Sequence, residues 1–318
     1  MTTVKTTCAY CGVGCGVLAT ATGARSATIA GDPAHPANFG KLCSKGTHLG
    51  ETIGLEGRLL HPMIGTRQAS WDDALDHVAQ RFAATIAEYG PDSVAFYASG
   101  QMLTEDYYVA NKLTKGFIGT ANIDTNSRLC MASAVAAHVR AFGEDVVPCS
   151  YDDLDATDLI VLVGSNTAWC HPVIWQRIEA ARAARGTKLV VIDPRRTETA
   201  ERADLHLAIA PDSDVALFTG LLAHMRSSWR LDGKALAERV SVPDGFWKTL
   251  PNPNAARTCD LAPADLQAFY DLFADHPRTI TLFSQGVNQS TSGTDKANAI
   301  INLHLATGRI GKPGAGPF

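Results

Sequence analysis

Apolar and polar residues alternate in blocks along most of the chain. From about residue 93, short apolar runs typical of buried strands are followed by longer segments with the period of an amphipathic helix. We predict strands at 93–99, 158–166, 187–194, 203–211 and 278–286, and helices at 104–119, 127–143, 172–186, 213–229 and 295–311. Such alternation is typical of mostly parallel sheets with helices on both faces, so the sequence predicts doubly wound α/β domains.

The first 57 residues show a different pattern. They are rich in Gly, Thr, Cys and Pro and lack a long helical period, which predicts short strands and loops held together by a metal centre. Within them, Cys8, Cys11, Cys15 and Cys43 have the spacing C-x2-C-x3-C-x27-C. Three thiolates on one tight glycine-rich loop and a fourth brought in by the fold suit a cubane 4Fe-4S cluster, in which each iron takes one protein sulfur.

Zinc is the main alternative to iron as the metal bound by these cysteines. Structural zinc usually takes its cysteines as two separated pairs, so the arrangement of three plus one favours the iron-sulfur cluster without excluding zinc. Eight cysteines in 318 residues do not resemble the dense disulfide framework of a small secreted domain. Lys45, two positions after Cys43, is either a solvated surface lysine or a cation beside the metal centre.

Charge and hydropathy exclude several classes of partner. The chain has 28 basic and 32 acidic side chains and a formal net charge of −4, which argues against a nucleic acid or an anionic membrane as partner. The longest apolar runs are far shorter than the roughly 20 residues that cross a bilayer. The amino-terminal segment resembles no export signal, so we expect a cytoplasmic location.

Three predicted loops follow strands at their carboxyl ends, the edge at which open α/β sheets bind ligands. They are GSNTAWCHP after Val163, DPRRTET after Ile192 and PDSD after Ile209. None of them is a GxGxxG or Walker sequence, so each alone is as consistent with ordinary turn chemistry as with a ligand. Together they favour a dinucleotide-like ligand, with these residues as candidate contacts: Gly164, Ser165, Asn166, Asp193, Asp212 and Asp214.

Cys130 stands apart from the cysteine cluster, in the segment NSRLCMASAV near the predicted start of a helix. A lone cysteine in an apolar helix is most often a buried structural residue. The first turn of a helix and the neighbouring Arg128 favour a thiolate, however, so a metal ligand or a nucleophile is the alternative. Cys149, Cys170 and Cys259 have no comparable setting and are expected to be structural.

These segments together resemble the molybdopterin-guanine-dinucleotide oxidoreductases. The cysteine cluster, CSKG, GSN followed by HP, DPRRT and GVNQSTSGTDKANAIINLHLATGRIGKPGAGPF occur in that family in this order, and the resemblance covers essentially the whole chain. Within the family, NSRLCMASAV and GSNTAWCHPV look most like the large subunit of cytoplasmic assimilatory nitrate reductases.

The resemblance implies a 4Fe-4S cluster on the four clustered cysteines, with Lys45 on the electron path to a pterin. It implies Cys130 as the thiolate ligand of molybdenum in a bis(molybdopterin guanine dinucleotide) cofactor, with Gln101 and Asn126 near the pterin. The residues implied to hold the guanine dinucleotide are Val163, Gly164, Ser165, Asn166, Cys170, Asp193, Pro194, Arg195, Asp212, Asp214, Gln285 and Gln289.

The implied reaction is the reduction of nitrate to nitrite by oxygen-atom transfer. The implied electron donor is ferredoxin, flavodoxin or an NAD(P)H-linked reductase subunit. Formate dehydrogenases of the family have His after the molybdenum ligand, whereas Met131 follows Cys130 here, which favours nitrate over formate.

Family members are longer and close a carboxyl-terminal domain over the pterins, a domain that we expect to be missing here because the sequence stops at the Gly/Pro segment GRIGKPGAGPF. A non-catalytic module for electron transfer that binds a cluster and a nucleotide is therefore an alternative to an enzyme. We expect a cluster domain at 1–57, a first and incomplete α/β domain at 58–100 and 285–318, and a dinucleotide-binding α/β domain inserted at 101–284.

Overall fold

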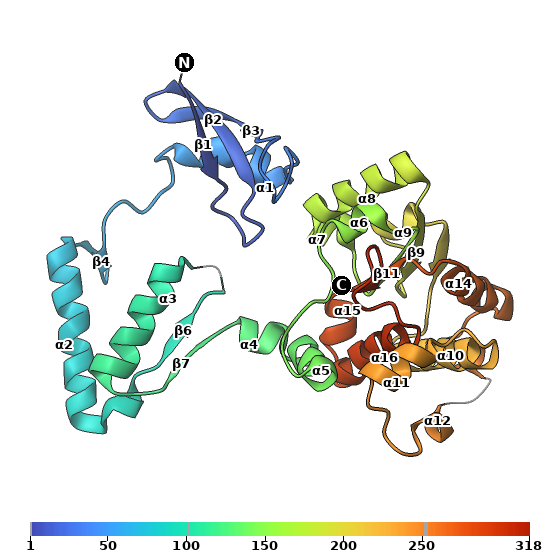
Figure 1. Ribbon diagram of the computed structural model, residues 1–318. Coiled ribbons are helices and arrows are strands. Elements are labelled where there is room, and N and C mark those ends of the chain that lie inside the picture. Colours follow the sequence, from blue (N-terminus) through green and yellow to red (C-terminus); the bar gives the residue numbers. More distant parts are fainter. Residues whose placement is uncertain (1, 101, 251–253) are drawn as a thin grey trace. The chain divides into compact units, whose positions relative to one another are not determined.

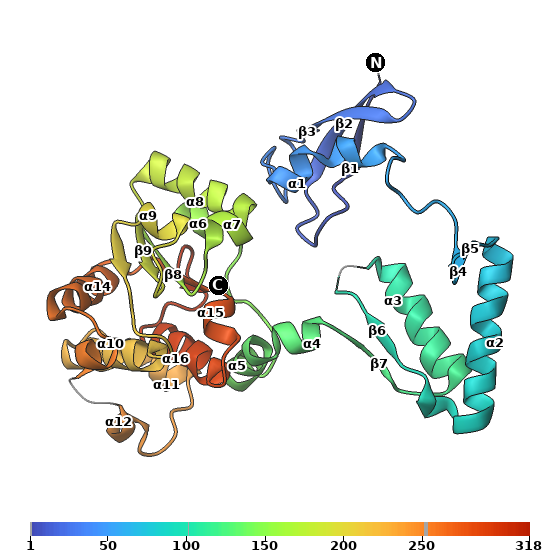
Figure 2. The same cartoon turned by 180° about the vertical axis from the view of Figure 1, so that it is seen from behind.

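The computed structural model describes residues 2–100, 102–250 and 254–318, with only the backbone of residues 127 and 128. The chain forms two compact units, Met1–Cys130 and Met131–Phe318, and each is described by itself. Figures 1 and 2 show the elements of both units from opposite sides. Among the described residues, none of the helices combines the length and the hydropathy that a bilayer crossing requires.

Unit 1 begins with a small antiparallel sheet of order β1-β2-β3, formed by β1 (Thr3–Thr7), β2 (Gly16–Gly23) and β3 (Ser26–Gly31). The cysteine-rich loop joins β1 to β2, and the short helices α1 (Ser44–Thr47) and η1 (Leu49–Ile53) follow the sheet. Asn38 is almost fully buried and bonds to both backbone groups of Gly16, at 2.8 Å and 3.1 Å, and to the carbonyl of Lys41 at 2.8 Å. This buried polar contact ties the strand β2 to the loop before α1, and the sequence analysis, which predicted a metal centre as the element that holds these loops, did not predict it.

The rest of unit 1 contains a long helix, α2 (Trp71–Tyr89), which the sequence analysis did not predict. The hydroxyl of Ser70 caps α2 by accepting a hydrogen bond from the backbone N–H of Asp73 at 3.1 Å. The predicted helix at 104–119 is confirmed as α3 (Thr104–Asn111) continued by a π-helical segment. The other elements are β4 (Met63–Ile64), β5 (Arg67–Gln68), η2 (Pro91–Ser93), β6 (Phe96–Ala98), η3 (Lys112–Ile118), β7 (Ile123–Thr125), which is parallel to β6, and α4 (Ser127–Cys130).

Unit 2 is built on a five-stranded sheet of order β10-β9-β8-β11-β12, and each neighbouring pair is parallel. Every residue of β8 (Leu159–Val163) is fully buried, which is the expected state of a central strand covered on both faces. Along the chain, β9 and β10 are added on one side of β8, and β11 and β12 are then added on its other side. The strands are β8, β9 (Lys188–Ile192), β10 (Leu205–Leu207), β11 (Thr279–Phe283) and β12 (Gly316–Pro317).

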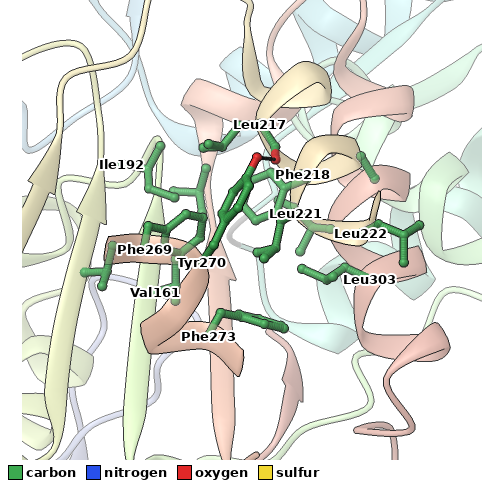
Figure 3. Close-up of a cluster of buried hydrophobic side chains, with 14 of the residues drawn as sticks. Val161, Ile192, Leu217, Phe218, Leu221, Leu222, Phe269, Tyr270, Phe273 and Leu303 are labelled. Atoms are coloured by element: carbon green, nitrogen blue, oxygen red, sulfur yellow. Dashed lines mark hydrogen bonds between the residues drawn. The ribbon is translucent and has the colours of Figure 1, made fainter. Parts of the chain in front are cut away.

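Helices cover both faces of this sheet, as predicted (Figures 1 and 2). Alternate residues of β8 contribute to two separate cores, with Val161 on one face and Leu162 on the other. Figure 3 shows the larger core, where Phe218 and Phe269 pack edge to face with ring centroids 6.3 Å apart. The helices are α5 (Ala132–Phe142), α6 (Asp153–Ala156), α7 (Thr167–Cys170), α8 (Pro172–Arg185), α9 (Glu198–Glu201), α10 (Asp214–Ser227), α11 (Gly233–Arg239), α12 (Phe246–Thr249), α13 (Ala255–Thr258), α14 (Pro263–Asp275), α15 (Gln285–Asn288) and α16 (Gly293–Ala306).

Two features differ from the sequence-based expectations. The predicted helix at 127–143 is two helices, because the backbone of Met131 (φ −118°, ψ 8°) interrupts it between α4 and α5. Residues 285–318, which we grouped with 58–100, pack in unit 2 together with 131–284. The reason is that β12 pairs with β11 and α16 packs on α5 and α10.

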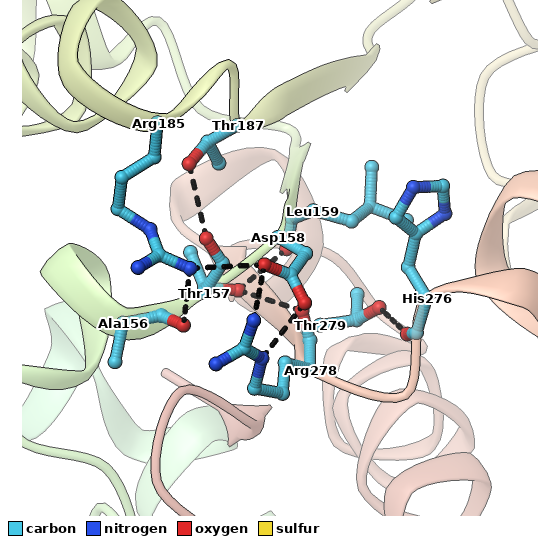
Figure 4. Close-up of polar contacts among 9 residues, drawn as sticks. All are labelled: Ala156, Thr157, Asp158, Leu159, Arg185, Thr187, His276, Arg278 and Thr279. Carbon is cyan, nitrogen blue, oxygen red and sulfur yellow. Dashed lines mark hydrogen bonds and ion pairs between the residues drawn. The ribbon is translucent and has the colours of Figure 1, made fainter.

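A polar cluster lies at the amino ends of β8, β9 and β11 (Figure 4). The guanidinium of Arg278 donates to both carboxylate oxygens of Asp158 at 2.7 Å, and Arg185 donates to Oδ1 of Asp158 at 3.0 Å. Thr187 donates to the carbonyl of Thr157 at 3.0 Å. These contacts tie three strands together at the edge opposite the predicted ligand loops, so we interpret the cluster as structural.

Candidate cluster and dinucleotide sites

The loop between β1 and β2 brings its three cysteines together. The backbone N–H of Cys8 donates to the carbonyl of Cys15 at 2.9 Å, which closes the loop at the start of the β1–β2 pairing. Inside it, the N–H of Gly14 donates to the carbonyl of Cys11 at 3.2 Å, and Gly14 has the left-handed φ of 63°. A side chain at this position would be strained, so glycine is required for the turn.

The fourth cysteine, Cys43, is the N-cap of α1, and its sulfur accepts a hydrogen bond from the N–H of Gly46 at 3.5 Å. Burial raises the pKa of the Cys15 thiol, and the neighbouring Cys11, Cys8 and Cys43 raise it further because thiolates repel one another. The four sulfurs are therefore close enough to interact electrostatically, and a bound cationic metal centre would relieve that repulsion.

A cubane cluster takes one cysteine at each of four irons, whereas a single ion requires ligands that converge on one point. Four cysteines supplied by one closed loop and one helix cap, with the N–H of Gly46 donating to the sulfur of Cys43, fit a 4Fe-4S cluster.

Lys45 lies on α1 next to this loop. Its side chain is exposed, and its ammonium lies 5.8 Å from the centroid of the Tyr10 ring, which belongs to the same loop as Cys8 and Cys11. A cation at this distance from an aromatic face is weakly attracted to it. The structure thus places Lys45 beside the cysteine loop, as the sequence motif CSKG suggested.

Cys130 is the last residue of α4, directly after β7, rather than near the start of a long helix. Its N–H donates to the carbonyl of Asn126 at 3.0 Å. The side-chain oxygen of Asn126 accepts from the N–H of Gly100 at 2.7 Å, so Asn126 links the loops that follow β6 and β7. Gln101 and the side chain of Arg128 lie outside the described residues.

In unit 2 the predicted loop after β8 meets the loop that follows β11 at the carboxyl ends of these two strands, where the strand order reverses. The N–H of Ser284 donates to the carbonyl of Val163 at 3.2 Å, and the N–H of Gly286 donates to the carbonyl of Gly164 at 3.0 Å. Nε2 of His171 lies 3.4 Å from the hydroxyl of Ser284. This topological switch point is the usual ligand site of open α/β sheets.

The loops after β8 and β9 are also joined. The hydroxyl of Thr199 donates to Oδ1 of Asn166 at 2.8 Å and accepts from the N–H of Ala168 at 3.0 Å. Ser165 is buried, and its hydroxyl lies 2.9 Å from that of Thr167. Ser165 and Asn166 therefore shape the loop, and the exposed Cys170 ends its short helix α7.

The loop after β9 turns around Asp193, which is mostly buried. Its Oδ1 accepts a hydrogen bond from the N–H of Arg195 at 2.9 Å, an Asx turn that leaves Pro194 and Arg195 exposed. The carboxylate of Asp193 thus stabilises the turn of its own loop. Arg195 presents a cation at the carboxyl edge of the sheet.

The loop after β10 carries the two predicted aspartates, and an unpredicted lysine binds both. Nζ of Lys296, a buried residue of α16, lies 2.8 Å from Oδ1 of Asp212 and 3.0 Å from Oδ2 of Asp214. The same Oδ1 of Asp212 accepts from the hydroxyl of Ser292 at 2.8 Å. Hydrogen bonds from Lys296 and Ser292 hold the pKa of Asp212 below its usual value.

The last two predicted contacts, Gln285 and Gln289, lie on and directly after α15, and both are exposed. The hydroxyl of Ser284 donates to the side-chain oxygen of Gln285, and the N–H of Gln289 donates to the carbonyl of Gln285 at 2.9 Å. Both glutamines therefore belong to the loop that follows β11.

Sequence reasoning missed Lys296, Ser292, His171, Thr199 and Gly286, which connect the loops to one another. None of these residues carried a local signal: Lys296 directly follows a second charged residue, Asp295, so the sequence alone is consistent with a solvated helix start. Of the three cysteines expected to be structural, Cys259 is buried, Cys149 is partly buried and Cys170 is exposed. Desolvation raises the pKa of Cys149 to about 12 and also raises that of Cys259.

Comparison with protein families agrees with this arrangement. Residues 1–54 match the family model described as molybdopterin oxidoreductase Fe4S4 domain, and residues 58–318 match the model described as molybdopterin oxidoreductase. The chain belongs to the molybdopterin oxidoreductase family. The predicted family and fold class are thereby confirmed.

Curated relatives of this molybdopterin oxidoreductase chain include two nitrate reductases. The protein from Klebsiella oxytoca is 54% identical over 100% of this chain and 37% of its own length. The protein from Shewanella frigidimarina is 51% identical over 100% of this chain and 35% of its own length. The chain therefore spans little more than a third of these two relatives.

A solved structure shares the fold. Acetylene hydratase from Pelobacter acetylenicus matches with a TM-score of 0.83 over 98% of this chain and 44% of its own, at 21% sequence identity. At that identity the likeness concerns the fold alone.

Proposed function

We propose that this chain is the cluster- and dinucleotide-binding part of a molybdenum-dependent nitrate reductase that serves nitrate assimilation. The observation that carries the proposal is the gathering of four cysteines by one closed loop and one helix cap in unit 1. The meeting of the ligand loops at the switch point of unit 2 supports the dinucleotide part. The 54% identity to a protein named nitrate reductase supports the substrate.

In this proposal the four clustered cysteines hold a 4Fe-4S cluster, and Lys45 supplies a cation beside it. Cys130 is the thiolate ligand of molybdenum, and the loops after β8, β9, β10 and β11 bind the guanine dinucleotide. When bound, the molybdenum cofactor supplies oxygen-atom transfer from nitrate, and the cluster delivers the electrons. The chain itself binds and orients these groups, through glycine backbones at the switch point and fixed polar side chains around it.

Met131 distinguishes nitrate from formate as the proposed substrate. It directly follows Cys130 in the sequence, and its thioether sulfur accepts a weak hydrogen bond from Nδ2 of Asn288 at 3.7 Å. A methionine offers no proton acceptor of useful basicity at the position where formate dehydrogenases of the family have His. A reaction without proton abstraction from the substrate is therefore favoured here.

Metal analysis of the full chain, purified from a host that makes the molybdenum cofactor, tests the proposal. We expect about four irons per chain, and molybdenum that is lost in Cys130→Ala while iron is kept. Cys43→Ala should lose iron. Cys259→Ala is the matched control, because Cys259 is buried within unit 2, outside the cysteine loop, and should keep both metals.

Activity is read as nitrate-dependent oxidation of a reduced viologen. Iron without molybdenum and without this activity would favour an electron-transfer module over an enzyme. Zinc in place of iron would overturn the cluster assignment. Viologen reduction that depends on formate would replace nitrate by formate as the substrate.

A further inference from the structure

Lys296 is a buried cation in a helix that is otherwise largely apolar. Only 2% of the residue is exposed, and α16 buries mainly Ala, Ile and Leu around it. An unpaired ammonium is costly in such a place, so its partners must be held firmly. Both partners, Asp212 and Asp214, come from the loop after β10, at the carboxyl edge of the sheet.

The two carboxylates are held differently. Asp214 is buried and opens α10, where a negative charge is favoured by the helix dipole. Asp212 is 63% exposed at its side chain and has the left-handed φ of 70°, a strained backbone for a residue other than glycine. Lys296 and Ser292 both bind its Oδ1, and Oδ2 has no polar partner among the described residues. One oxygen is thus fixed and the other is presented to solvent.

We infer that Lys296 is a positioning residue that orients the carboxylate of Asp212 to accept the N–H donors of the guanine base. This inference rests on the proposed function, because it deepens the dinucleotide assignment. A carboxylate fixed through one oxygen gives its second oxygen a defined direction, and an ionised acceptor forms stronger hydrogen bonds than a neutral one. Ser292 begins α16 after the loop that follows β11, so the same contacts also set the spacing of the two loops.

A purely structural role for Lys296 makes a different prediction. In that case its loss would weaken binding of every nucleotide alike, because the loops would loosen without any change in base recognition. A positioning role requires a loss of discrimination at the guanine edge. The measured quantity is therefore the ratio of dissociation constants for inosine diphosphate and guanosine diphosphate, which differ only in the exocyclic amino group.

The experiment is isothermal titration of the full chain with guanosine diphosphate and with inosine diphosphate. We expect the unmodified chain to prefer guanosine diphosphate by about tenfold or more, the usual effect of one hydrogen bond to a charged acceptor. Lys296→Met should bring this ratio close to one. Ser292→Ala removes only the second anchor and leaves no buried charge unpaired, so it should lower the ratio partway in a folded protein.

Arg309→Met is the matched control. Arg309 is also a buried cation and follows the other end of α16, where it donates to the carbonyls of His276 and Phe273 at 2.8 Å and 2.7 Å. This variant should lose stability but keep the ratio.

An unchanged ratio in both Lys296→Met and Ser292→Ala, with guanosine diphosphate still bound, overturns the inference alone. Absence of binding by the folded, unmodified chain overturns the dinucleotide part of the proposed function, and the inference with it.

Discussion

The backbones of Gly164 and Gly286 are in direct contact at the carboxyl ends of β8 and β11. A Cβ at Gly164 would lie 2.7 Å from Cα of Gly286, and a Cβ at Gly286 would lie 2.6 Å from Cα of Gly164. Gly164 also has a φ of 54°. Because both obstacles are backbone atoms, neither can rotate away, so the two ligand loops approach each other only if both residues are glycine.

Gly286→Ala should therefore separate the loops at the switch point. We expect a loss of about 1 to 3 kcal/mol in the free energy of unfolding, as for other overpacked sites, and weaker binding of guanosine diphosphate. Chemical denaturation and titration calorimetry measure the two effects. Gly233→Ala is the control, since no atom lies within 4 Å of a Cβ there. Equal effects of the two substitutions would contradict the close-contact explanation.

The larger core of unit 2 depends on the aromatic pair of α10 and α14. Phe269 is fully buried and contacts Phe218 edge to face. Phe269→Ala should lower the free energy of unfolding by about 3 to 5 kcal/mol, because it removes a large apolar group and leaves a cavity. Trp229→Ala, at a residue 93% exposed, should change it by less than about 0.5 kcal/mol. Urea denaturation measures both values. Similar losses of unfolding free energy in the two variants would show that the stability of unit 2 does not depend on this aromatic pair.

The parallel sheet and its ligand edge were predictable because their signals are local. The runs DLIVLVG and TKLVVIDP are strand-length and apolar, and β8 and β9 form within them. Pro172 and Gly186 delimit α8 as predicted, with Gly186 at a φ of 72°. The polar residues that follow each strand reach one edge of the sheet simply because the strands are parallel.

Other features depend on contacts between distant residues and had no local signal. The break at Met131 lies within a segment whose composition suits one continuous helix. β12 contains only Gly316 and Pro317, so its pairing with β11 could not be distinguished from a Gly/Pro loop. The ion pairs of Lys296 join residues more than 80 positions apart, and these residues come together only because the fold places α16 against the loop after β10 at the carboxyl edge of the sheet.

Asn38 is expected to control how firmly unit 1 holds its metal centre. Its three hydrogen bonds to the backbone of Gly16 and Lys41 connect the strand that follows Cys15 to the segment that precedes Cys43. Asn38→Ala should cost about 2 to 4 kcal/mol of stability, since buried backbone groups lose their partners. Iron should then be lost faster to a chelator, as followed by absorbance. Thr3→Ala is the control: it removes only an exposed hydrogen bond to Thr20, so iron should be lost at the same rate as from the unmodified chain.

Acid should destabilise unit 2 through His304. This side chain is fully buried, its Nε2 lies 2.8 Å from the hydroxyl of Thr281, and burial together with the charge of Arg309 holds its pKa well below 6.5. The unfolded chain takes up a proton below about pH 6.5 while the folded chain does not, so stability falls as the pH drops, by at most about 1.4 kcal/mol per pH unit. His304→Gln keeps a hydrogen-bond partner for Thr281 but cannot titrate. Urea denaturation between pH 7.5 and 5, a range of about two and a half units, should show a flatter pH dependence for this variant. The same slope in both proteins would mean that His304 takes up its proton in the folded state as readily as in the unfolded one.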